Sequence, residues 1–320
     1  MDPISHAIIG LSIYGLQQTP EISNPALLGT IIGALAPDFD IVTKIRSDYV
    51  YLKHHRVETH SLLGVVVISV LITLGLSFFY PMFAFGEVLI WTLIGTLSHI
   101  LFDLLNSYGV ALLYPFSSKK FSLNLITIYD PVVLLLSGYV LFLSKRTLHE
   151  NLSVTFIFFL YLILKEINKK SLTKKIGSYY RNECINAKIN RINVMPSDYS
   201  VIKWDYIVCT EKEYIVGEIK SYNGFPRAFK RLAKTFDPII EKTENEVLGL
   251  YFKNFTPIFH VEFEQEKNGF IVKMIDLRYK VKNGFKHHAM FYYSDNSQLI
   301  KSVFHPFNMD NQIEVRKNTL

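Results

Sequence analysis

The chain has 320 residues, of which 49% are hydrophobic and 19% charged, and its net charge is +6. Residues 1–170 hold eleven Lys and Arg and eleven Asp and Glu, whereas the remaining residues hold 23 and 17, which gives all of the net charge. This division predicts a neutral, apolar domain over 1–170 and a basic, more polar domain over 176–320. The two cysteines, Cys184 and Cys209, have no CxxC spacing, which argues against a disulfide framework or a structural zinc knuckle and favours reduced thiols.

The first apolar segments do not resemble a signal peptide, because no basic residue precedes them and Asp2 and His6 interrupt the start. They are IIGLSIYGL and ALLGTIIGALA, joined by QQTPEISNP. Each is too short to cross a bilayer unaided, so we expect a tilted hairpin or a buried re-entrant pair. Either arrangement returns the chain to the face on which it started.

Four later segments are predicted to cross the membrane as helices. They cover residues 62–80, about 85–106, 131–143 and, beginning at Leu152, the run LSVTFIFFLYLIL. The expected fold is therefore a helical polytopic membrane domain, with four spans and a short N-terminal hairpin, followed by a soluble α+β domain.

The basic residues of the connecting loops indicate the orientation. Lys and Arg gather in residues 37–61, in residues 107–129 and after the last span, and such loops face the cytoplasm. We therefore expect a multi-pass protein of the cytoplasmic (inner) membrane, with its C-terminal domain in the cytoplasm.

This orientation places several imidazoles and carboxylates at one membrane face. His99 and Asp103 share a helix face because they are four residues apart, and both are costly in hydrocarbon unless they have a function or lie near the interface. The other residues come from the hairpin, from APDFD and from HHRVETHS. The candidate metal ligands are His6, Asp38, Asp40, His55, His60, His99 and Asp103. Mixed nitrogen and oxygen ligands suit one or two Zn²⁺ ions, with Mn²⁺ as the second choice.

Each motif also has a structural interpretation. A single His can be a packing residue, APDFD can form a turn and helix cap, and HHRVETHS can be a basic segment at the membrane edge. The i, i+4 pair can be a buried ion pair. Thr59, Ser61 and Ser98 can orient the imidazoles or cap helices. The convergence of four separate stretches on one face favours metal binding over these alternatives.

The reaction implied by such a site is hydrolysis. A carboxylate such as Asp103 could bridge two metals and activate water, with Asp38 or Asp40 as general base. Arg56 could clamp a phosphate or a carboxylate, or contact lipid headgroups. The location favours a phosphoester of a membrane lipid or lipid-linked intermediate as substrate, with a carboxylic ester left open. The competing hypotheses are an ion or solute transporter and a membrane-anchored regulator, with a structural metal and a protein partner for its C-terminal domain.

The motifs resemble a known family. MDPISHAIIG, GALAPDFD, HHRVETHS, GTLSHILFDLLNSYG, LLYPFSSKKFSL and IYDP together look like the YdjM-like predicted membrane-bound metal-dependent hydrolases, in the YfhP-like branch. The family is thought to be distantly similar to zinc-dependent phospholipase C and the P1-type nucleases. The resemblance implies His6, an aspartate of APDFD, a histidine of HRxxTH, His99 and a bridging Asp103 as ligands. Those soluble enzymes also use an N-terminal amine and later His and HxxxE ligands, which have no clear counterpart here, so a mono- or dinuclear site is implied.

The second domain alternates aromatic and β-branched residues with polar ones, as strands do. TEKE, EKNG and VKNG are the expected turns, and residues 225–254 are expected to be helical in part. The modest positive charge favours contact with anionic lipid headgroups over nucleic acid. His287 and His288 are expected in an exposed loop, without carboxylates nearby and not as ligands.

Overall fold

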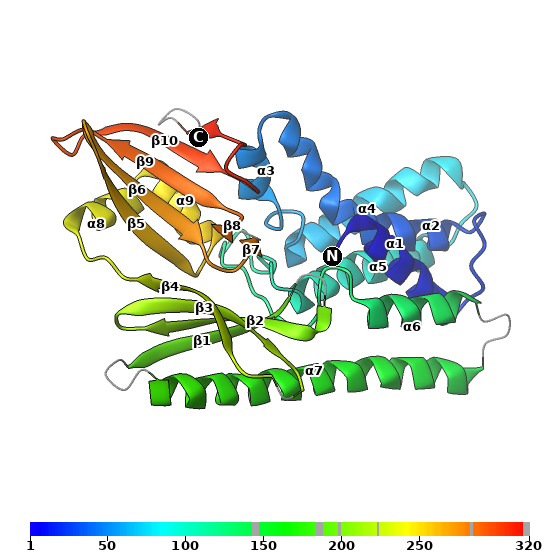
Figure 1. The fold of residues 1–320 in the computed structure, drawn as a ribbon. Coiled ribbons are helices and arrows are strands. Elements are labelled where there is room, and N and C mark those ends of the chain that lie inside the picture. Colours follow the sequence, from blue (N-terminus) through cyan, green and yellow to red (C-terminus); the bar gives the residue numbers. More distant parts are fainter. Residues whose placement is uncertain (143–146, 184–187, 198–199, 223, 282–283, 316–320) are drawn as a thin grey trace.

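The computed structural model describes residues 1–320 apart from 143–146, 184–187, 198–199, 223, 282–283 and 316–320. Its first part is helical. The helices are α1 (Pro3–Gly15), α2 (Pro25–Leu35), the 3₁₀ helix η1 (Ala36–Ile45), α3 (Asp48–His54), α4 (Leu62–Phe79), α5 (Phe85–Leu105), α6 (Pro131–Phe142) and α7 (Leu148–Glu183). Helices α1, α2, α4 and α5 pack together, and α7 extends from beside them to the far end of the molecule (Figure 1).

Local sequence explains where most of these helices begin. Asp2 accepts hydrogen bonds from the backbone N–H groups of Ile4 and Ser5, and proline occupies the first turn of both α1 and α2. Ser61 caps α4 by accepting from the N–H of Gly64. The cap interpretation of Ser61 is therefore confirmed.

Three helical segments are long and apolar enough to cross a membrane, namely Pro25–Ile45, Leu62–Phe79 and Phe85–Leu105. Two of them are predicted spans. The first combines α2 with η1. The α2 segment was predicted to be the second half of a short hairpin, and the APDFD segment of η1 was predicted to follow it. The third predicted span forms only the 12-residue α6, and the fourth forms the first part of α7, a single 36-residue helix. Four spans are therefore not confirmed.

Glycines let α2 and α5 approach closely. A Cβ built on Gly95 would lie 2.1 Å from the backbone oxygen of Thr30, and one on Gly33 would lie 2.6 Å from that of Thr92. Backbone atoms cannot move aside as the end of a side chain can, so the contact requires glycine. Because α2 leads into η1 and α5 carries the His99–Asp103 pair, this packing sets the distance between APDFD and that pair.

We therefore expect Gly95→Ala to destabilise the protein by about 1–3 kcal/mol, the usual cost of overpacking. Gly75→Ala is the matched control, since a Cβ at Gly75 in α4 meets nothing within 4 Å. The control should leave stability unchanged or raise it slightly, because alanine favours helix. Thermal unfolding of the purified proteins in detergent measures both, and equal transition temperatures would contradict the close approach.

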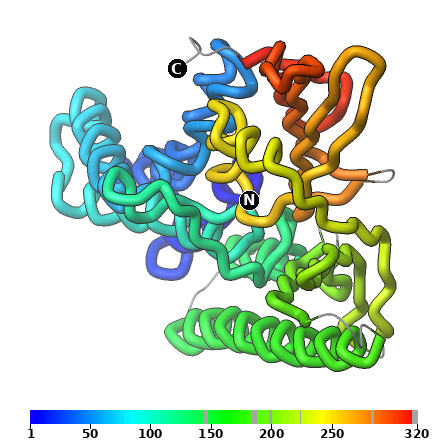
Figure 2. Tube along the Cα trace, turned by 90° about the vertical axis from the view of Figure 1, so that its left-hand side faces the viewer, coloured from blue at the N-terminus to red at the C-terminus, as the bar shows by residue number. Residues whose placement is uncertain are grey.

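The second part of the chain contains two antiparallel sheets. The first is a meander of β1 (Ile189–Ser197), β2 (Ser200–Thr210), β3 (Glu213–Lys220) and β4 (Arg227–Ala233). It packs on the C-terminal half of α7, where Leu172, Ile176 and Tyr180 meet Trp204 and Tyr206. Figures 1 and 2 show α7 running along this sheet.

The second sheet has the strand order β11-β10-β9-β6-β5. Its strands are β5 (Phe259–Glu266), β6 (Gly269–Asp276), β9 (His288–Tyr293), β10 (Leu299–His305) and β11 (Ile313–Glu314). The short strands β7 (Lys280–Val281) and β8 (Gly284–Phe285) pair separately from this sheet. Two helices, α8 (Pro238–Glu244) and α9 (Val247–Phe255), precede β5 in the chain. The expected turns at TEKE and EKNG are confirmed, and VKNG lies between β7 and β8 with residues 282–283 outside the described part. The partial helicity expected over 225–254 is confirmed, since α8 and α9 form there after β4.

Helix α3 belongs to the first part of the chain but packs into the core of the second. Tyr49 and Leu52 are buried with residues of α9 and the second sheet, and the ring of Tyr49 lies 4.7 Å from that of Tyr251. Asn311 donates a 2.7 Å hydrogen bond to Asp48 at the start of the helix. Figure 2 shows α3 beside α9. The two parts therefore meet through α3, directly before the HHRVETHS segment.

Candidate metal centre

Four predicted ligands meet in one cluster. Ligand atoms of Asp38, His60, His99 and Asp103 all lie within 4.8 Å of one another. Asp38 comes from η1, His60 from the turn before α4, and His99 and Asp103 from one face of α5. The side chains of His60, His99 and Asp103 have no exposed surface, and that of Asp38 is 14% exposed. We call these four residues the cage.

Hydrogen bonds orient the two imidazoles of the cage. Nδ1 of His99 lies 2.7 Å from the backbone oxygen of Ala34, so it carries the proton and leaves the lone pair on Nε2. That Nε2 faces Nε2 of His60 at 3.2 Å. The remaining ring nitrogen of His60 is held by the hydroxyl of Thr59 at 2.9 Å. Two ring nitrogens are thus directed at one point, as metal ligation requires.

The carboxylates lie on either side of this point. Oδ1 of Asp38 lies 3.6 Å from Nε2 of His60 and 3.5 Å from that of His99. Oδ2 of Asp103 lies 3.5 Å and 3.8 Å from the same two nitrogens. Two nitrogens and two carboxylate oxygens form a mixed donor set that would suit a divalent cation such as Zn²⁺.

His6 lies at the edge of the cage. Its Nε2 is 3.4 Å from Oδ1 of Asp103, and its ring stacks on that of His99 with centroids 3.7 Å apart. Neither ring nitrogen of His6 has a hydrogen-bond partner among the described residues, although the side chain is buried. The amino group of Met1 also contacts Asp103. His6 and the Met1 amine therefore both lie at Oδ1 of Asp103, although the sequence showed no clear counterpart of an N-terminal amine ligand.

A second cluster adjoins the cage through Asp38. Ligand atoms of Asp38, Asp40 and His55 lie within 4.8 Å of one another. Both carboxylate oxygens of Asp40 lie 3.0 Å from Nδ1 of His55. Burial lowers the pKa of His55 to about 4, although the hydrogen bond to Asp40 acts in the opposite direction. His55 is therefore neutral at pH 7, with its Nε2 lone pair free for a ligand. HRxxTH thus places one histidine in each cluster.

Asp40 also fixes the backbone of the HHRVETHS segment. It accepts a 3.2 Å hydrogen bond from the N–H of Arg56, which has the left-handed φ of 64°. A non-glycine residue adopts this conformation only when its surroundings hold it there. The geometry directs the Arg56 side chain inward, where it is 5% exposed as a residue.

The guanidinium of Arg56 clamps a carboxylate of this chain. Its Nη2 lies 3.0 Å from Asp103, and its Nη1 donates to the side-chain oxygen of Asn106 at 3.1 Å. Asn106 in turn donates to Asp103 at 2.9 Å. The sequence interpretation missed Asn106, although its position three residues after Asp103, at the end of the same helix, offered a signal.

An aromatic stack connects Arg56 to the C-terminal domain. The guanidinium lies 5.0 Å from the ring centroid of Tyr108, which stacks on Tyr279 at 4.4 Å with an interplanar angle of 15°. The guanidinium of Arg278 lies 5.0 Å from the Tyr279 ring and is itself paired with Asp276. Residues far apart in the sequence thus support one side of the cage, and no local pattern indicates them.

Several polar residues of the same face have structural roles. Asp2 caps α1, and Asp130 accepts hydrogen bonds from the N–H groups of Val132 and Val133 at the start of α6. His54 pairs with Glu58 at 2.8 Å and belongs to neither cluster, as expected from its position next to His55. The hydroxyl of Ser98 donates to the backbone oxygen of Gly95 within α5.

The expectation for His287 and His288 was wrong in placement. They are 1% and 6% exposed, in the sheet domain and not in an exposed loop. His287 also has a carboxylate nearby, because the charge of Asp276 acts on it. His288 is the first residue of β9, and His287 directly precedes the strand, where its ring contacts those of Phe255 and Phe307. Cys209 is a free thiol, and Cys184 lies outside the described residues.

Comparison of the sequence with known protein families gives two matches. The family model described as YdjM inner membrane protein matches residues 1–172, which include every candidate ligand. The chain belongs to the YdjM family. A second model, the YfhP C-terminal alpha/beta plait domain, matches residues 238–316, the part that forms α8, α9 and the second sheet.

The family and its apolar helices identify the chain as a membrane protein. A relative in Bacillus subtilis (strain 168), described as uncharacterized protein YfhP, is 26% identical to this chain over 296 residues. The matched region covers 89% of each of the two proteins. No solved structure matches. The family model and the YfhP relative therefore confirm the resemblance to the YdjM family and its YfhP-like branch.

Proposed function

We propose that the membrane domain is a metal-dependent hydrolase, with the cage as its metal site. The observation that carries the proposal is the meeting of two imidazole nitrogens and two carboxylates, from three separate elements, with ligand atoms within 4.8 Å of one another. A structural ion pair would need only one such partner for each carboxylate. A divalent cation held there supplies Lewis acidity, which activates water and polarises a phosphoryl group. Zn²⁺ suits this donor set best, and Mn²⁺ is the second choice.

The residues around the cage have separable roles in this proposal. His60, His99 and the two carboxylates hold the ion. His6 lies next to Asp103 and is a candidate additional ligand. Asp40 is the better candidate for general base than Asp38, because Asp38 belongs to both clusters and is committed to the cage. Arg56 is a positioning residue that fixes the orientation of Asp103, which corresponds to the carboxylate alternative among the roles that the sequence suggested for it.

The proposed substrate is a phosphoester of a membrane lipid or a lipid-linked intermediate. The cage lies at the ends of the apolar segments Pro25–Ile45 and Phe85–Leu105, where a headgroup would meet it. Helix η1, which carries the acidic pair of APDFD, also exposes apolar side chains, including Phe39, Val42 and Ile45. These features support a substrate that is presented from the membrane, with the C-terminal domain on the cytoplasmic side.

The test uses full-length protein in nanodiscs that contain a defined mixture of phospholipids. Protein loaded with Zn²⁺ or Mn²⁺ should release phosphorylated or free headgroups, detected by mass spectrometry. Chelation should abolish release, and addition of the metal should restore it. Stoichiometric metal without any hydrolysis of phosphoesters or carboxylic esters would leave the cage with a structural role and favour a membrane-anchored binding protein.

A further inference from the structure

A cavity of about 370 Å³ lies between the two parts of the chain, outside the metal centre. The loop after α5 forms one wall, and β1, the end of α9 and the segment after β6 form the other. Every charged residue that lines the cavity is basic. These residues are Lys119, Lys120, Arg191, Lys253 and Arg278, and serine and asparagine side chains fill much of the remaining wall.

Carboxylates balance only part of this positive charge. Lys253 pairs with Glu244 at 2.9 Å, and Arg278 pairs with Asp276 at 2.8 Å. Within the described part of the chain, the other three cations have no carboxylate at ion-pair distance. Lys120 instead donates to a neutral group, the backbone oxygen of His55, at 2.8 Å. Like charges gathered around one cavity repel each other, and an anion placed among them removes that cost.

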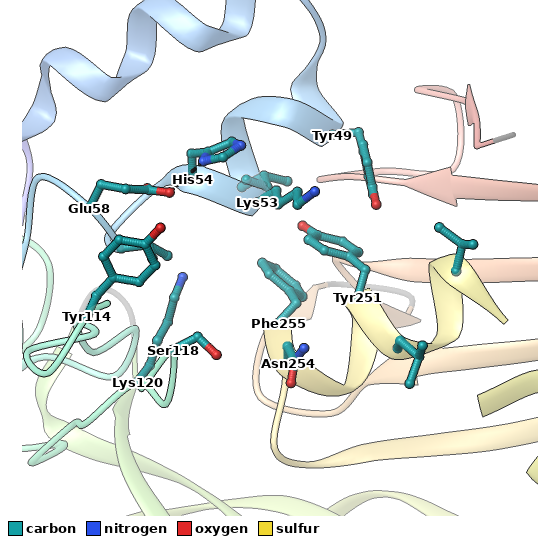
Figure 3. Close-up of a pocket in the computed structure, with 14 residues that line it drawn as sticks. Tyr49, Lys53, His54, Glu58, Tyr114, Ser118, Lys120, Tyr251, Asn254 and Phe255 are labelled. Atoms are coloured by element: carbon teal, nitrogen blue, oxygen red, sulfur yellow. Dashed lines mark hydrogen bonds and ion pairs between the residues drawn. The ribbon is translucent and has the colours of Figure 1, made fainter. Parts of the chain in front are cut away.

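A second cavity of about 420 Å³ adjoins the first and is more apolar. Ser118, Lys120, Asn254 and Phe255 line both. Figure 3 shows α3, the 114–120 loop and α9 around it, with the amine of Lys120 directed into the space. Leucine, valine and aromatic side chains form most of its remaining wall. The two cavities together form one cleft with a basic end and an apolar end.

We propose that this interdomain cleft binds a phosphate-bearing ligand, with the phosphate between Lys119, Lys120 and Arg191. Arginine and lysine are the side chains that recognise phosphate, through charge-assisted hydrogen bonds. The apolar end accommodates a hydrophobic part of the same ligand. The proposal goes beyond the hydrolase function, because it gives the C-terminal domain a ligand and holds whether or not the cage hydrolyses that ligand.

The position of Lys120 connects the cleft to the metal centre. Its amine holds the backbone of His55, whose ring bonds Asp40 on the other side. A phosphate that attracts this amine therefore acts on a residue of the second cluster. The same phosphate chemistry is offered by a lipid headgroup and by a soluble phosphate compound, and the experiment separates these sources.

The experiment measures binding to full-length protein in neutral detergent after metal removal with EDTA, by calorimetric titration. One arm uses inorganic pyrophosphate, and the other uses short-chain phosphatidic acid. The test variant is Lys119→Gln with Arg191→Gln, two exposed residues that make no ion pair among the described residues. We expect it to weaken binding by about tenfold or more, since charge-assisted contacts are lost.

The control is Lys174→Gln with Lys188→Gln, which removes the same charge from exposed positions that do not line the cleft. Its affinity should stay within about twofold of the original, because neither residue lines the cleft and exposed charges outside it are screened by solvent and salt. Binding of phosphatidic acid alone identifies a lipid ligand, and binding of pyrophosphate identifies a soluble one. Failure of the unaltered protein to bind either probe overturns the proposal, as does an equal loss in both double variants.

These outcomes are independent of the metal centre. The titrations contain no metal, so an absent or structural metal leaves them unchanged. Conversely, the Lys119 and Arg191 variant should retain the metal content of the unaltered protein, because neither residue belongs to the cage. The cleft and the hydrolase proposal can therefore fail separately.

Discussion

Asp103→Ala and His99→Ala are expected to lose the bound divalent cation. Each substitution removes one of the four donors of the cage, and at Asp103 it also removes the carboxylate that Met1, His6 and Arg56 surround. Loss of a residue that merely orients a ligand already costs about 10–100-fold in metal affinity, so loss of a ligand itself should exceed 100-fold. Purified variants analysed by inductively coupled plasma mass spectrometry should contain less than about a tenth of the original metal.

Two matched variants show whether the loss is specific. His54→Ala removes a histidine that pairs with Glu58 and belongs to neither cluster. Asp130→Asn alters a buried carboxylate that serves α6 as a cap, and asparagine caps helices equally well. Both should keep full metal content. Retention of stoichiometric zinc by folded Asp103→Ala would refute the cage as the metal site.

Arg56→Met is expected to destabilise the protein by about 3–5 kcal/mol, the cost of removing one partner of a buried ion pair. Arg56 is the buried basic side chain that contacts Asp103, and it also donates to Asn106. The stability of Arg56→Lys should lie between those of the original protein and Arg56→Met, because lysine keeps the charge but lacks the planar donor fork. Thermal unfolding in detergent measures the series, with the exposed Arg46→Met as control.

Metal should change the size of this effect. A divalent cation in the cage also compensates the charge of Asp103, so the deficit of Arg56→Met should be larger after chelation than in the metal-loaded protein. An Arg56→Met protein as stable as the original in both states would contradict the clamp. An equal deficit with and without metal would show that the ion does not reach Asp103.

The sequence indicated most of the cage because its signals are local. A spacing of four residues puts His99 and Asp103 on one helix face, and the apolar segments bring APDFD and HHRVETHS to the same membrane end. The role of Asn106 follows from the same helix geometry and could have been predicted from the sequence. The contribution of Tyr279 could not, because its stacking on Tyr108 depends on how the two domains pack.

Neighbouring elements also decide details of the secondary structure that the sequence left open. Residues 225–254 were expected to be helical only in part, and the segment around Arg227 forms β4 because β3 offers it a partner edge. Residues 25–45 were divided at Pro37, but proline is tolerated in the first turn of η1, so the helical path continues from α2. In both cases a neighbouring element decided what local preference left open.

The packing of α3 against α9 has a consequence for biogenesis. The ribosome makes α3 early, directly before His55 and Arg56, but makes its partners Tyr251 and Phe304 last. Tyr49 and Leu52 thus keep exposed apolar surface while the first helices enter the membrane. We therefore expect the segment that carries Arg56 to reach its final conformation only after the second sheet has formed and packed against α3.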